Sequence, residues 1–351
     1  MKKEKEQEHL NPALPLALDT ETELIGAGRL APRCACVTVA QQRQRAAIYT
    51  PRDMVPLLKR WIVESDQWLI GHNIAYDLLV LTRFAPDLCS FVWYLYDTGR
   101  VWDLGIHERL YCLGMGWSMH PAIGKPIVTG GVSLADLARG LVSVEYGSLK
   151  SSSSSPRMHY GDLIDTPLDQ WDEANVRYAL MDADTTLTVG LYQMDRLEEV
   201  QWSTANHEKI ELPSQSLQIR AAWALHHLGA WGLRTCPQRV NEWTDTLTSE
   251  HSTLADELKK TGLIRENGKK DLSVIRERVA VAYGDTTPRS EKGNIQTSGE
   301  ILKESGDDKL IQLAEYQDLD KLKGTFGPTL TSASKRTLSP RWNPLVRSGR
   351  V

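Results

Sequence analysis

The chain has 351 residues, of which 41% are hydrophobic and 25% are charged, and its formal net charge at pH 7 is −4. This length predicts two structural units and a sizeable buried core. The slightly acidic balance disfavours a sequence-specific DNA-binding module, which would carry a broad basic surface. A metal-dependent nuclease stays open, because its active site is itself a cluster of acidic side chains.

The chain shows no sign of export or membrane insertion. No apolar run approaches the roughly 18–20 residues that a membrane-spanning helix requires. The N-terminal lysines are not followed by the apolar stretch of a signal peptide, so residues 1–12 are interpreted as a flexible tail. Five cysteines without a repeating CxxC spacing favour neither a disulfide framework nor a zinc site. We therefore expect a protein of the reducing cytoplasm with no membrane partner.

The first half of the chain alternates short apolar segments with helical patterns. Helical spacing occurs at 53–64, at 75–84 and in the later part of 101–114. The early strands follow each other with no helix between them, so the fold class is α/β and the sheet is expected to be mixed. The segments with strand character are 14–20, 34–40, 46–49, 67–73 and the start of 101–114.

Two irregular stretches interrupt this pattern. Residues 114–131 are rich in glycine and proline and predict a long loop, and the run of serines within 149–156 predicts a flexible excursion. Between them, 133–141 predicts a short helix with Ser133 as its N-cap. A long helix, in one or two pieces, is expected over about 167–200.

The second half changes character. Over about 210–326 the pattern is helical, strand signals disappear and charged residues become more frequent. We place the domain boundary near 201–210, because the composition shifts there. The expected organisation is a first domain at 13–205 and a mainly helical region at 206–351.

Two acids, Asp19 and Glu21, stand at the end of the first predicted strand. Alternate residues of a strand point to the same face, so both carboxylates would lie side by side. Their repulsion is tolerable if a divalent cation sits between them. On its own the pattern is weak, because D-x-E is also common among exposed loop acids.

Two further pairs of residues are each spaced one helical turn apart. Asn73 and Asp77 lie where a strand gives way to a helix; the alternative is that Asn73 only caps that helix and Asp77 is solvated. Tyr178 and Asp182 lie on the late helix, where the phenol could orient a water molecule and the acid could bind metal. The alternative there is a core tyrosine beside a surface acid. Asp184 faces elsewhere on the helix and is not expected to bind metal.

The order of these three motifs along the chain is more informative than each motif alone. A D-x-E after the first strand, an N-x3-D after a later strand and a Y-x3-D on a late helix resemble the three exonuclease motifs of DEDDy-type 3′–5′ exonucleases. The resemblance extends over about residues 14–200 and is poorest at 114–131 and 148–160. It implies a ribonuclease H-like fold and a hydrolytic site with two divalent ions, Mg²⁺ or Mn²⁺.

The resemblance also implies a role for each residue. Asp19 would bridge both ions, and Glu21 and Asp182 would complete the site of the ion that binds the attacking water. Asp77 would serve the other ion, and Tyr178 would hydrogen-bond the water. Next to the acids, Leu24 or Ile25 would act as a wedge against the last base, or either would be an ordinary core contact. The residues expected to bind the terminal nucleotide are Thr20, Thr22, Ile25, His72 and Asn73.

The second half is similar to the thumb of family A DNA polymerases. The segment 211–237 looks like the start of that thumb, and 294–304 and 310–326 look like its later helices. The stretch RWNPLVRSGR (341–350) is similar to the element that opens the palm. This match covers about residues 208–350 and implies that the nuclease proofreads for a polymerase.

The thumb resemblance implies DNA as a partner, with primer-template DNA and single-stranded 3′ ends as substrates. Its backbone would be contacted by lysines and arginines at 259–270 and by Lys321 and Lys323. Solvated helix ends and loops explain these residues equally well. Such a polymerase implies the cytoplasm of a bacterial or phage-infected cell.

The chain ends at Val351, just inside the element that resembles the start of the palm. In that family the catalytic acids of the polymerase and the fingers lie further along. We therefore expect no polymerase activity from this chain alone. Either a separate palm-and-fingers chain is its partner, or the sequence was cut at that point.

Two alternative functions stay open at this stage. An RNA-directed DEDDy enzyme of the ribonuclease D type would share the same site residues, although the thumb-like second half argues against it. A non-catalytic polymerase assembly subunit would use the nuclease fold as a scaffold. Scaffold versions usually lose metal ligands, whereas this sequence retains all of them.

Overall fold

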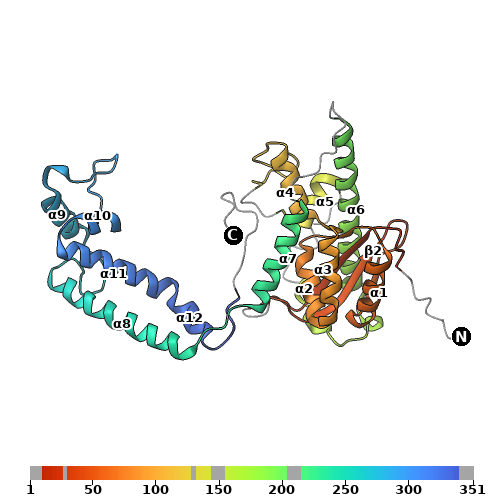
Figure 1. Ribbon diagram of the computed structural model, residues 1–351, viewed down its shortest axis with the longest axis horizontal. Coiled ribbons are helices and arrows are strands. Elements are labelled where there is room, and N and C mark those ends of the chain that lie inside the picture. The colour runs from red at the N-terminus through yellow and green to blue at the C-terminus, as the bar shows by residue number, and fades with distance from the viewer. Residues whose placement is uncertain (1–9, 27–29, 128–131, 144–154, 204–214, 340–351) are drawn as a thin grey trace. The chain divides into compact units, whose positions relative to one another are not determined.

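The computed structural model describes residues 10–26, 30–127, 132–143, 155–203 and 215–339, without the side chains of 198–203. Contacts divide the chain into two compact units (Figure 1). The first is Met1–Trp231 together with Ser339–Val351, and the second is Gly232–Leu338. The predictions for the tail before residue 10, for the serines at 151–154 and for the palm-like element at 341–350 lie outside the described residues.

The described part of the first unit contains a mixed five-stranded sheet. Strands that follow each other directly, β1–β2 and β2–β3, pair antiparallel, whereas β1–β4 and β4–β5 pair parallel. Parallel neighbours need a crossover, and here helices provide it. The prediction of an α/β fold with a mixed sheet is therefore confirmed. In sheet order the strands are β3 (Ala47–Tyr49), β2 (Cys34–Ala40), β1 (Leu16–Thr22), β4 (Leu69–Gly71) and β5 (Val101–Asp103).

Helices cover both faces of this sheet (Figure 1). Because side chains alternate along β1, Leu16 and Leu18 pack with α1, α2, α3 and α7, and Ala17 packs with α5 and α6. The same alternation sends Asp19 and Glu21 toward the α6 side. The helices are α1 (Pro51–Glu64), α2 (Ile74–Phe84), α3 (Cys89–Asp97), α4 (Leu104–Gly114), α5 (Leu134–Val142), α6 (Glu173–Ser203) and α7 (Gln215–Trp231).

Helix α7 belongs to the first unit. Its residues Ile219, Ala222 and Trp223 are buried in the same core as α2 and α3, and the Trp223 ring stacks on Tyr96 with 5.4 Å between ring centroids. The expected boundary near 201–210 lies mostly outside the described residues, and the structure divides the chain later, after Trp231. The difference arises because Ile219, Ala222 and Trp223 of this helix are buried in the core of the first unit.

Some of the described residues between the motifs have regular local structure. Part of the expected loop at 114–131 folds back on itself, since Met119 and Pro126 form an antiparallel bridge. Ser133 caps α5 as predicted, by accepting a hydrogen bond from the Asp136 amide at 3.2 Å within a capping box. The late helix α6 is one continuous helix of 31 residues that begins at Glu173.

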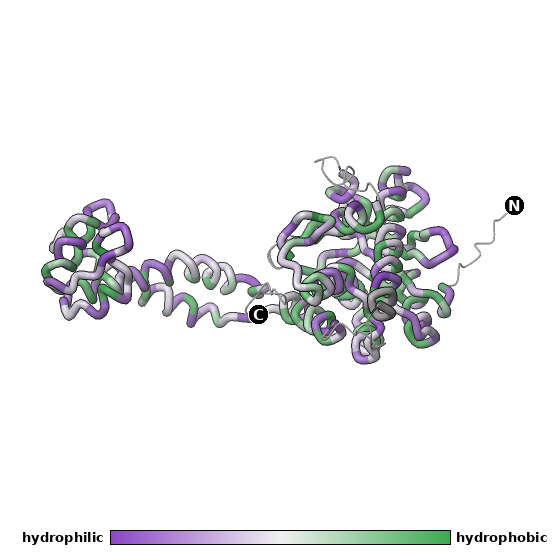
Figure 2. Tube along the Cα trace, turned by 90° about the horizontal axis from the view of Figure 1, so that it is seen from above, coloured by the Kyte–Doolittle hydropathy of each residue, from purple (hydrophilic) through white to green (hydrophobic). Residues whose placement is uncertain are grey.

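The described part of the second unit is helical and has its own core. Leu258, Val279, Leu310 and Leu313 are among its fully buried residues. Figure 2 shows hydrophobic and hydrophilic residues alternating along its long helices, as expected for helices buried on one side. No helix among the described residues is long and apolar enough to cross a membrane. The helices of this unit are α8 (Pro237–Lys260), α9 (Leu272–Tyr283), α10 (Gly299–Glu304), α11 (Asp308–Thr325) and α12 (Gly327–Ala333).

Candidate active site

The structure brings three of the predicted acids together at the end of β1. Asp19 and Glu21 extend from β1, and Asp182 extends from α6, which packs on that face of the sheet. One carboxylate oxygen from each lies within 4.8 Å of the others. Glu21 and Asp182 are each only 6% exposed. This proximity results from strand alternation combined with the packing of α6.

The fourth acid, Asp77, reaches the site from the other face of the sheet. It lies in the first turn of α2 and is 3% exposed. Its Oδ1 accepts two hydrogen bonds from Thr20, one from the backbone amide at 3.0 Å and one from the hydroxyl at 2.6 Å. Thr20, expected to bind nucleotide, is buried, and both of these hydrogen bonds hold the Asp77 carboxylate. Asp77 lies outside the close set of three oxygens.

The electrostatics of these acids fit a bound cation. Burial, followed by the charges of Asp19 and Glu21, raises the pKa of Asp182 well above its usual range. Burial and the charge of Asp19 likewise raise the pKa of Asp77, although the hydrogen bonds from Thr20 oppose the shift. Burying several carboxylates together is costly unless positive charge compensates them. Clustered carboxylate oxygens are the ligands that Mg²⁺ and Mn²⁺ prefer, so these residues fit such an ion.

Tyr178 lies one helical turn before Asp182 on α6 and is 2% exposed. Its ring lies 6.3 Å from that of Tyr160, centroid to centroid, in a small cluster that also contains Trp171. Burial and the charge of Glu21 raise its pKa, so the phenol stays protonated at neutral pH. Its hydroxyl has no hydrogen-bond partner within the described residues. A buried hydroxyl without a partner is a donor available to a ligand.

His72 and Asn73 occupy the turn between β4 and α2. Asn73 is exposed and left-handed, with a φ of 58°, and its side chain makes no capping hydrogen bond within the described chain. Asp103, at the end of β5, accepts the hydrogen bond from the Ile74 amide instead, at 3.1 Å. His72 is anchored by a 2.8 Å hydrogen bond between its Nε2 and the carbonyl of Val132. The Asn73 side chain therefore stays available for a substrate.

The residues after the D-x-E differ in exposure. The Thr22 hydroxyl lies 2.8 Å from the hydroxyl of Tyr76, which comes from α2. Leu24 and Ile25 are 53% and 54% exposed, so neither is the ordinary core contact that the sequence left open. Asp184, two residues after Asp182, is exposed on α6, as its helical position predicts.

Sequence reasoning missed two residues that shape this site. Asp103 ends β5 and caps both α2 and α4, since its other oxygen accepts from the amides of Gly105 and Ile106. An aspartate directly between an apolar strand and a helix is an N-cap signal that could have identified it. Tyr76 neighbours Asp77 in sequence, but nothing in the sequence predicted its contact with Thr22.

A second group of potential ligands does not resemble a metal site. Glu108, Cys112 and His120 are buried close together on and beside α4. Glu108 accepts hydrogen bonds from His120 Nε2 at 2.9 Å, from Gln193 at 2.9 Å and from both terminal nitrogens of Arg196, at 3.1 and 2.6 Å. Its pKa is lowered, because the Arg196 pairing outweighs burial. The charge of this acid is already compensated by the protein.

Comparisons with known proteins identify the fold and the family of this chain. The solved structure of the POL domain of Pol1 from M. smegmatis, a complex with DNA primer-template and dNTP, is similar with a TM-score of 0.55 at 13% sequence identity. That match covers 97% of this chain but only 50% of the other, so this chain spans half the length of its structural neighbour. No curated protein sequence matches this chain. Residues 2–196, more than half of the chain, match the 3′–5′ exonuclease family model of the DNA polymerase A type, and the chain therefore belongs to that 3′–5′ exonuclease family.

Proposed function

We propose that this protein removes nucleotides one at a time from the 3′ ends of DNA by metal-dependent hydrolysis. The observation that carries the proposal is the trio of Asp19, Glu21 and Asp182, whose oxygens approach within 4.8 Å of one another in a chain of the exonuclease family. With Asp77 they would hold two divalent cations, Mg²⁺ or Mn²⁺. Bound there, such cations supply positive charge that stabilises the attacking and leaving oxygens of a phosphodiester.

The side chains around the acids would position the reactants. The buried, protonated Tyr178 hydroxyl would donate a hydrogen bond to the attacking water and so fix its direction. Asn73 offers an exposed amide for the sugar or phosphate of the last nucleotide, next to the anchored His72. The exposed Ile25 side chain would press against the terminal base.

Thr20 would act on the substrate only indirectly, through Asp77. Both of its hydrogen bonds go to Asp77 Oδ1, so neither of them engages Oδ2. A carboxylate that is held in one orientation loses less entropy when it binds a cation. We therefore assign Thr20 a positioning role and not direct contact with the nucleotide.

We further propose that the nuclease proofreads beside a family A polymerase. The likeness to the M. smegmatis structure extends over both units of this chain and supports a thumb-like role for Gly232–Leu338. Under this proposal, a palm-and-fingers module completes the polymerase, and lysines and arginines of the second unit contact the DNA backbone. Adding this protein to such a module should lower its misincorporation rate, and an unchanged rate would count against proofreading.

The direct test is degradation of a 5′-labelled DNA oligomer in the presence of Mg²⁺. We expect stepwise shortening from the 3′ end, which chelation by EDTA abolishes. Asp19→Ala should be inactive although its circular dichroism is unchanged, because Asp19 is central to the acid cluster. Asp184→Asn, on the exposed side of α6, should stay active and is the matched control. Retained activity in Asp19→Ala would contradict the assignment of these acids as the catalytic site.

The same assay separates the alternatives. A ribonuclease D type enzyme would degrade an RNA oligomer of the same sequence faster than the DNA oligomer. A non-catalytic assembly subunit would degrade neither and would show no heat of divalent-ion binding near neutral pH. The three clustered acids, the nearby Asp77 and the unfavourable mutual charge of all four support the catalytic alternative.

A further inference from the structure

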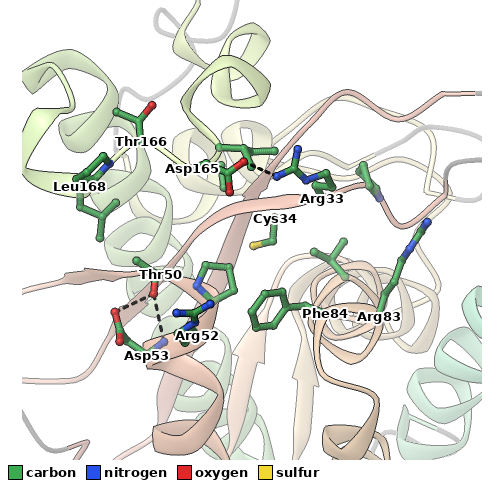
Figure 3. A pocket seen from close by; sticks show the side chains of 16 residues that line it. Arg33, Cys34, Thr50, Arg52, Asp53, Arg83, Phe84, Asp165, Thr166 and Leu168 are labelled. Carbon is green, nitrogen blue, oxygen red and sulfur yellow. Dashed lines mark hydrogen bonds and ion pairs between the residues drawn. The ribbon is translucent and has the colours of Figure 1, made fainter.

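A pocket of about 610 Å³ adjoins the acid cluster and takes no part in the chemistry described above. It is bounded by the start of β2, the N-terminus of α1, the second half of α2 and residues 164–168, which precede α6. Figure 3 shows Arg33, Arg52 and Arg83 arranged around Cys34, with the ring of Phe84 between Arg52 and Arg83 in that view. We call this feature the arginine pocket.

The arginine pocket lies next to the catalytic acids in the fold. Cys34 on its wall pairs with Thr22 of β1, the residue after Glu21. Val80, also on its wall, is three residues from Asp77 along α2. A helix rises 1.5 Å per residue, so Phe84 lies about 10 Å from Asp77 along the axis. That distance is about three steps of a stacked nucleic-acid strand.

The charges in the pocket favour an anion. Three arginines face two aspartates, Asp53 and Asp165, which gives a local excess of +1 in a chain whose net charge is −4. Asp165 is paired with Arg33 at 2.7 Å, and Asp53 is engaged by the Thr50 hydroxyl at 2.7 Å. Neither Arg52 nor Arg83 forms an ion pair among the described residues, and the pocket keeps one net positive charge.

Those two arginines are also free to bind. Arg52 is exposed and has no hydrogen-bond or ion-pair partner within the part of the chain that the structure describes. Arg83 donates one hydrogen bond to the carbonyl of Ala31, at 2.5 Å, which holds the side chain without neutralising it. Guanidinium groups bind phosphate through paired hydrogen bonds, so both are suited to a phosphodiester backbone.

Phe84 adds an aromatic surface to the same pocket. Its side chain is 51% exposed although it ends a helix whose other apolar residues are largely buried. Proteins that hold single-stranded nucleic acid combine cationic side chains that follow the backbone with aromatic rings on which bases stack. Phe84 between two unpaired arginines is such a combination.

We propose that the arginine pocket binds the single strand on the 5′ side of the scissile bond, beginning about three nucleotide steps from the 3′-terminal nucleotide. Arg52 and Arg83 contact its phosphates and Phe84 stacks on a base. The proposal rests on the nuclease function proposed above and adds a binding subsite to it. Its consequence is that substrate length matters: a strand too short to reach the pocket gains nothing from the arginines.

The test compares two 5′-labelled oligothymidylates, a 3-mer and a 10-mer, with the full chain and Mg²⁺. Arg52→Ala, Arg83→Ala and the double variant are measured against Arg45→Ala. Arg45 is an exposed arginine just after β2, at the opposite end of that strand from Cys34, so it controls for the loss of charge. The double variant should lose about 10-fold in kcat/KM on the 10-mer, as expected when two phosphate contacts are removed. On the 3-mer its kcat/KM should stay within about 2-fold of the wild type.

Salt dependence provides a second readout. Each phosphate contact to a single strand contributes about 0.7 to the slope of log KM against log salt concentration, so the double variant should lose about 1.4. An equal loss of activity on both oligomers, or no loss on either, would overturn the proposal. Weaker inhibition by deoxythymidine 5′-monophosphate, without a length-dependent loss, would assign the pocket to the released product and overturn it as well.

The outcomes also distinguish this proposal from the proposed nuclease function. If the wild type degrades neither oligomer, the nuclease proposal fails first. Binding of the labelled 10-mer to Asp19→Ala, followed by fluorescence anisotropy with and without the two arginine substitutions, then tests the pocket without catalysis. Binding to Asp19→Ala that is unaffected by removing Arg52 and Arg83 would contradict the pocket assignment.

Discussion

Two groups of potential metal ligands lie in the same unit and differ in how the charge of their buried acids is compensated. Glu108 is surrounded by donors, and Arg196 holds its pKa below the usual range despite burial. Asp182 is equally buried, but burial and its acidic neighbours raise its pKa. A bound cation would stabilise a buried carboxylate that lies among like charges, whereas a carboxylate whose charge the protein already compensates gains little from one. The difference separates a structural network from a candidate catalytic site more clearly than the residue types do, since both clusters offer metal-binding atoms.

The largest expected effect concerns the structural network. Glu108→Ala leaves the partly buried Arg196 without its carboxylate, and we expect a loss of about 3 kcal/mol in the free energy of unfolding. Urea denaturation measures it, and Asp195→Ala, an exposed acid on α6, should change stability by less than about 0.5 kcal/mol. Below its melting temperature, Glu108→Ala should keep the kcat of the wild type. If a divalent metal ion stabilised the wild type but not Glu108→Ala, the Glu108 network would itself be a metal site, and the contrast between the two groups would be wrong.

The second prediction concerns the catalytic acids and their response to metal and pH. The folded-state pKa of Asp182 is raised, so its contribution to stability is full below its unfolded pKa and is lost as pH rises through the folded value. The metal-free protein should therefore be less stable at pH 7 than near pH 5. Mg²⁺ at about 100 times its Kd should restore about 2.7 kcal/mol. Thermal melting with EDTA or Mg²⁺ across this pH range measures both effects.

Asp182→Asn tests the origin of this behaviour. The variant lacks the repelled charge, so its metal-free form should melt higher than the wild type at pH 7, and Mg²⁺ should no longer raise its melting temperature. Asp184→Asn makes the same substitution two residues away and should keep the full response to Mg²⁺. A metal response that survived in Asp182→Asn would mean that this acid is not a ligand. The Glu108 network should behave oppositely, contributing less stability as the pH falls.

The next prediction concerns the hydrogen bond that Thr20 donates to Asp77. Thr20→Val removes the 2.6 Å hydrogen bond to Asp77 and should raise the activation free energy by about 2 kcal/mol, the usual value for a bond to a charged group. Because the effect acts through Asp77, the Mg²⁺ concentration for half-maximal activity should rise as well. Thr20→Ser keeps the hydroxyl and should restore most of both. An increase in KM alone, with an unchanged Mg²⁺ requirement, would indicate that Thr20 binds the nucleotide directly.

The sequence predicted those parts of the site that depend on local spacing. Alternation along β1 placed Asp19 and Glu21 on one face, and helical spacing placed Tyr178 and Asp182 one turn apart. It could not predict contacts between elements that meet only in the folded chain. The hydrogen bonds from Thr20 to Asp77 join residues 57 positions apart, and the choice of Asp103 to cap α2 depends on β5 lying beside β4.

The same limit explains the difference in domain division. The composition of α7 resembles that of the helical region after it, so sequence patterns grouped the two together. Its membership in the first unit depends on Trp223 stacking on Tyr96, a contact made by only a few residues. Exposure is equally hard to infer, since Leu24 and Ile25 are apolar but lie largely in solvent.

The smallest predicted effect separates function from stability most clearly. The Tyr178 hydroxyl is buried and has no partner among the described side chains and backbone, so Tyr178→Phe removes an unsatisfied group and should leave the melting temperature unchanged or higher. Tyr160→Phe, in the same aromatic cluster, loses a 2.8 Å hydrogen bond to the carbonyl of Asn175 and should melt lower. Melting curves of the two variants measure this difference.

The effect on kcat should have the opposite order. Tyr178→Phe should be about 10-fold slower than the wild type, which corresponds to about 1.4 kcal/mol, because the attacking water loses one hydrogen bond while every acid stays in place. Single-turnover rates of both variants measure this effect. If Tyr178→Phe were as inactive as Asp19→Ala, the phenol would be doing more than orienting water, whereas an unchanged rate would make it a core residue whose hydroxyl serves no step of the reaction.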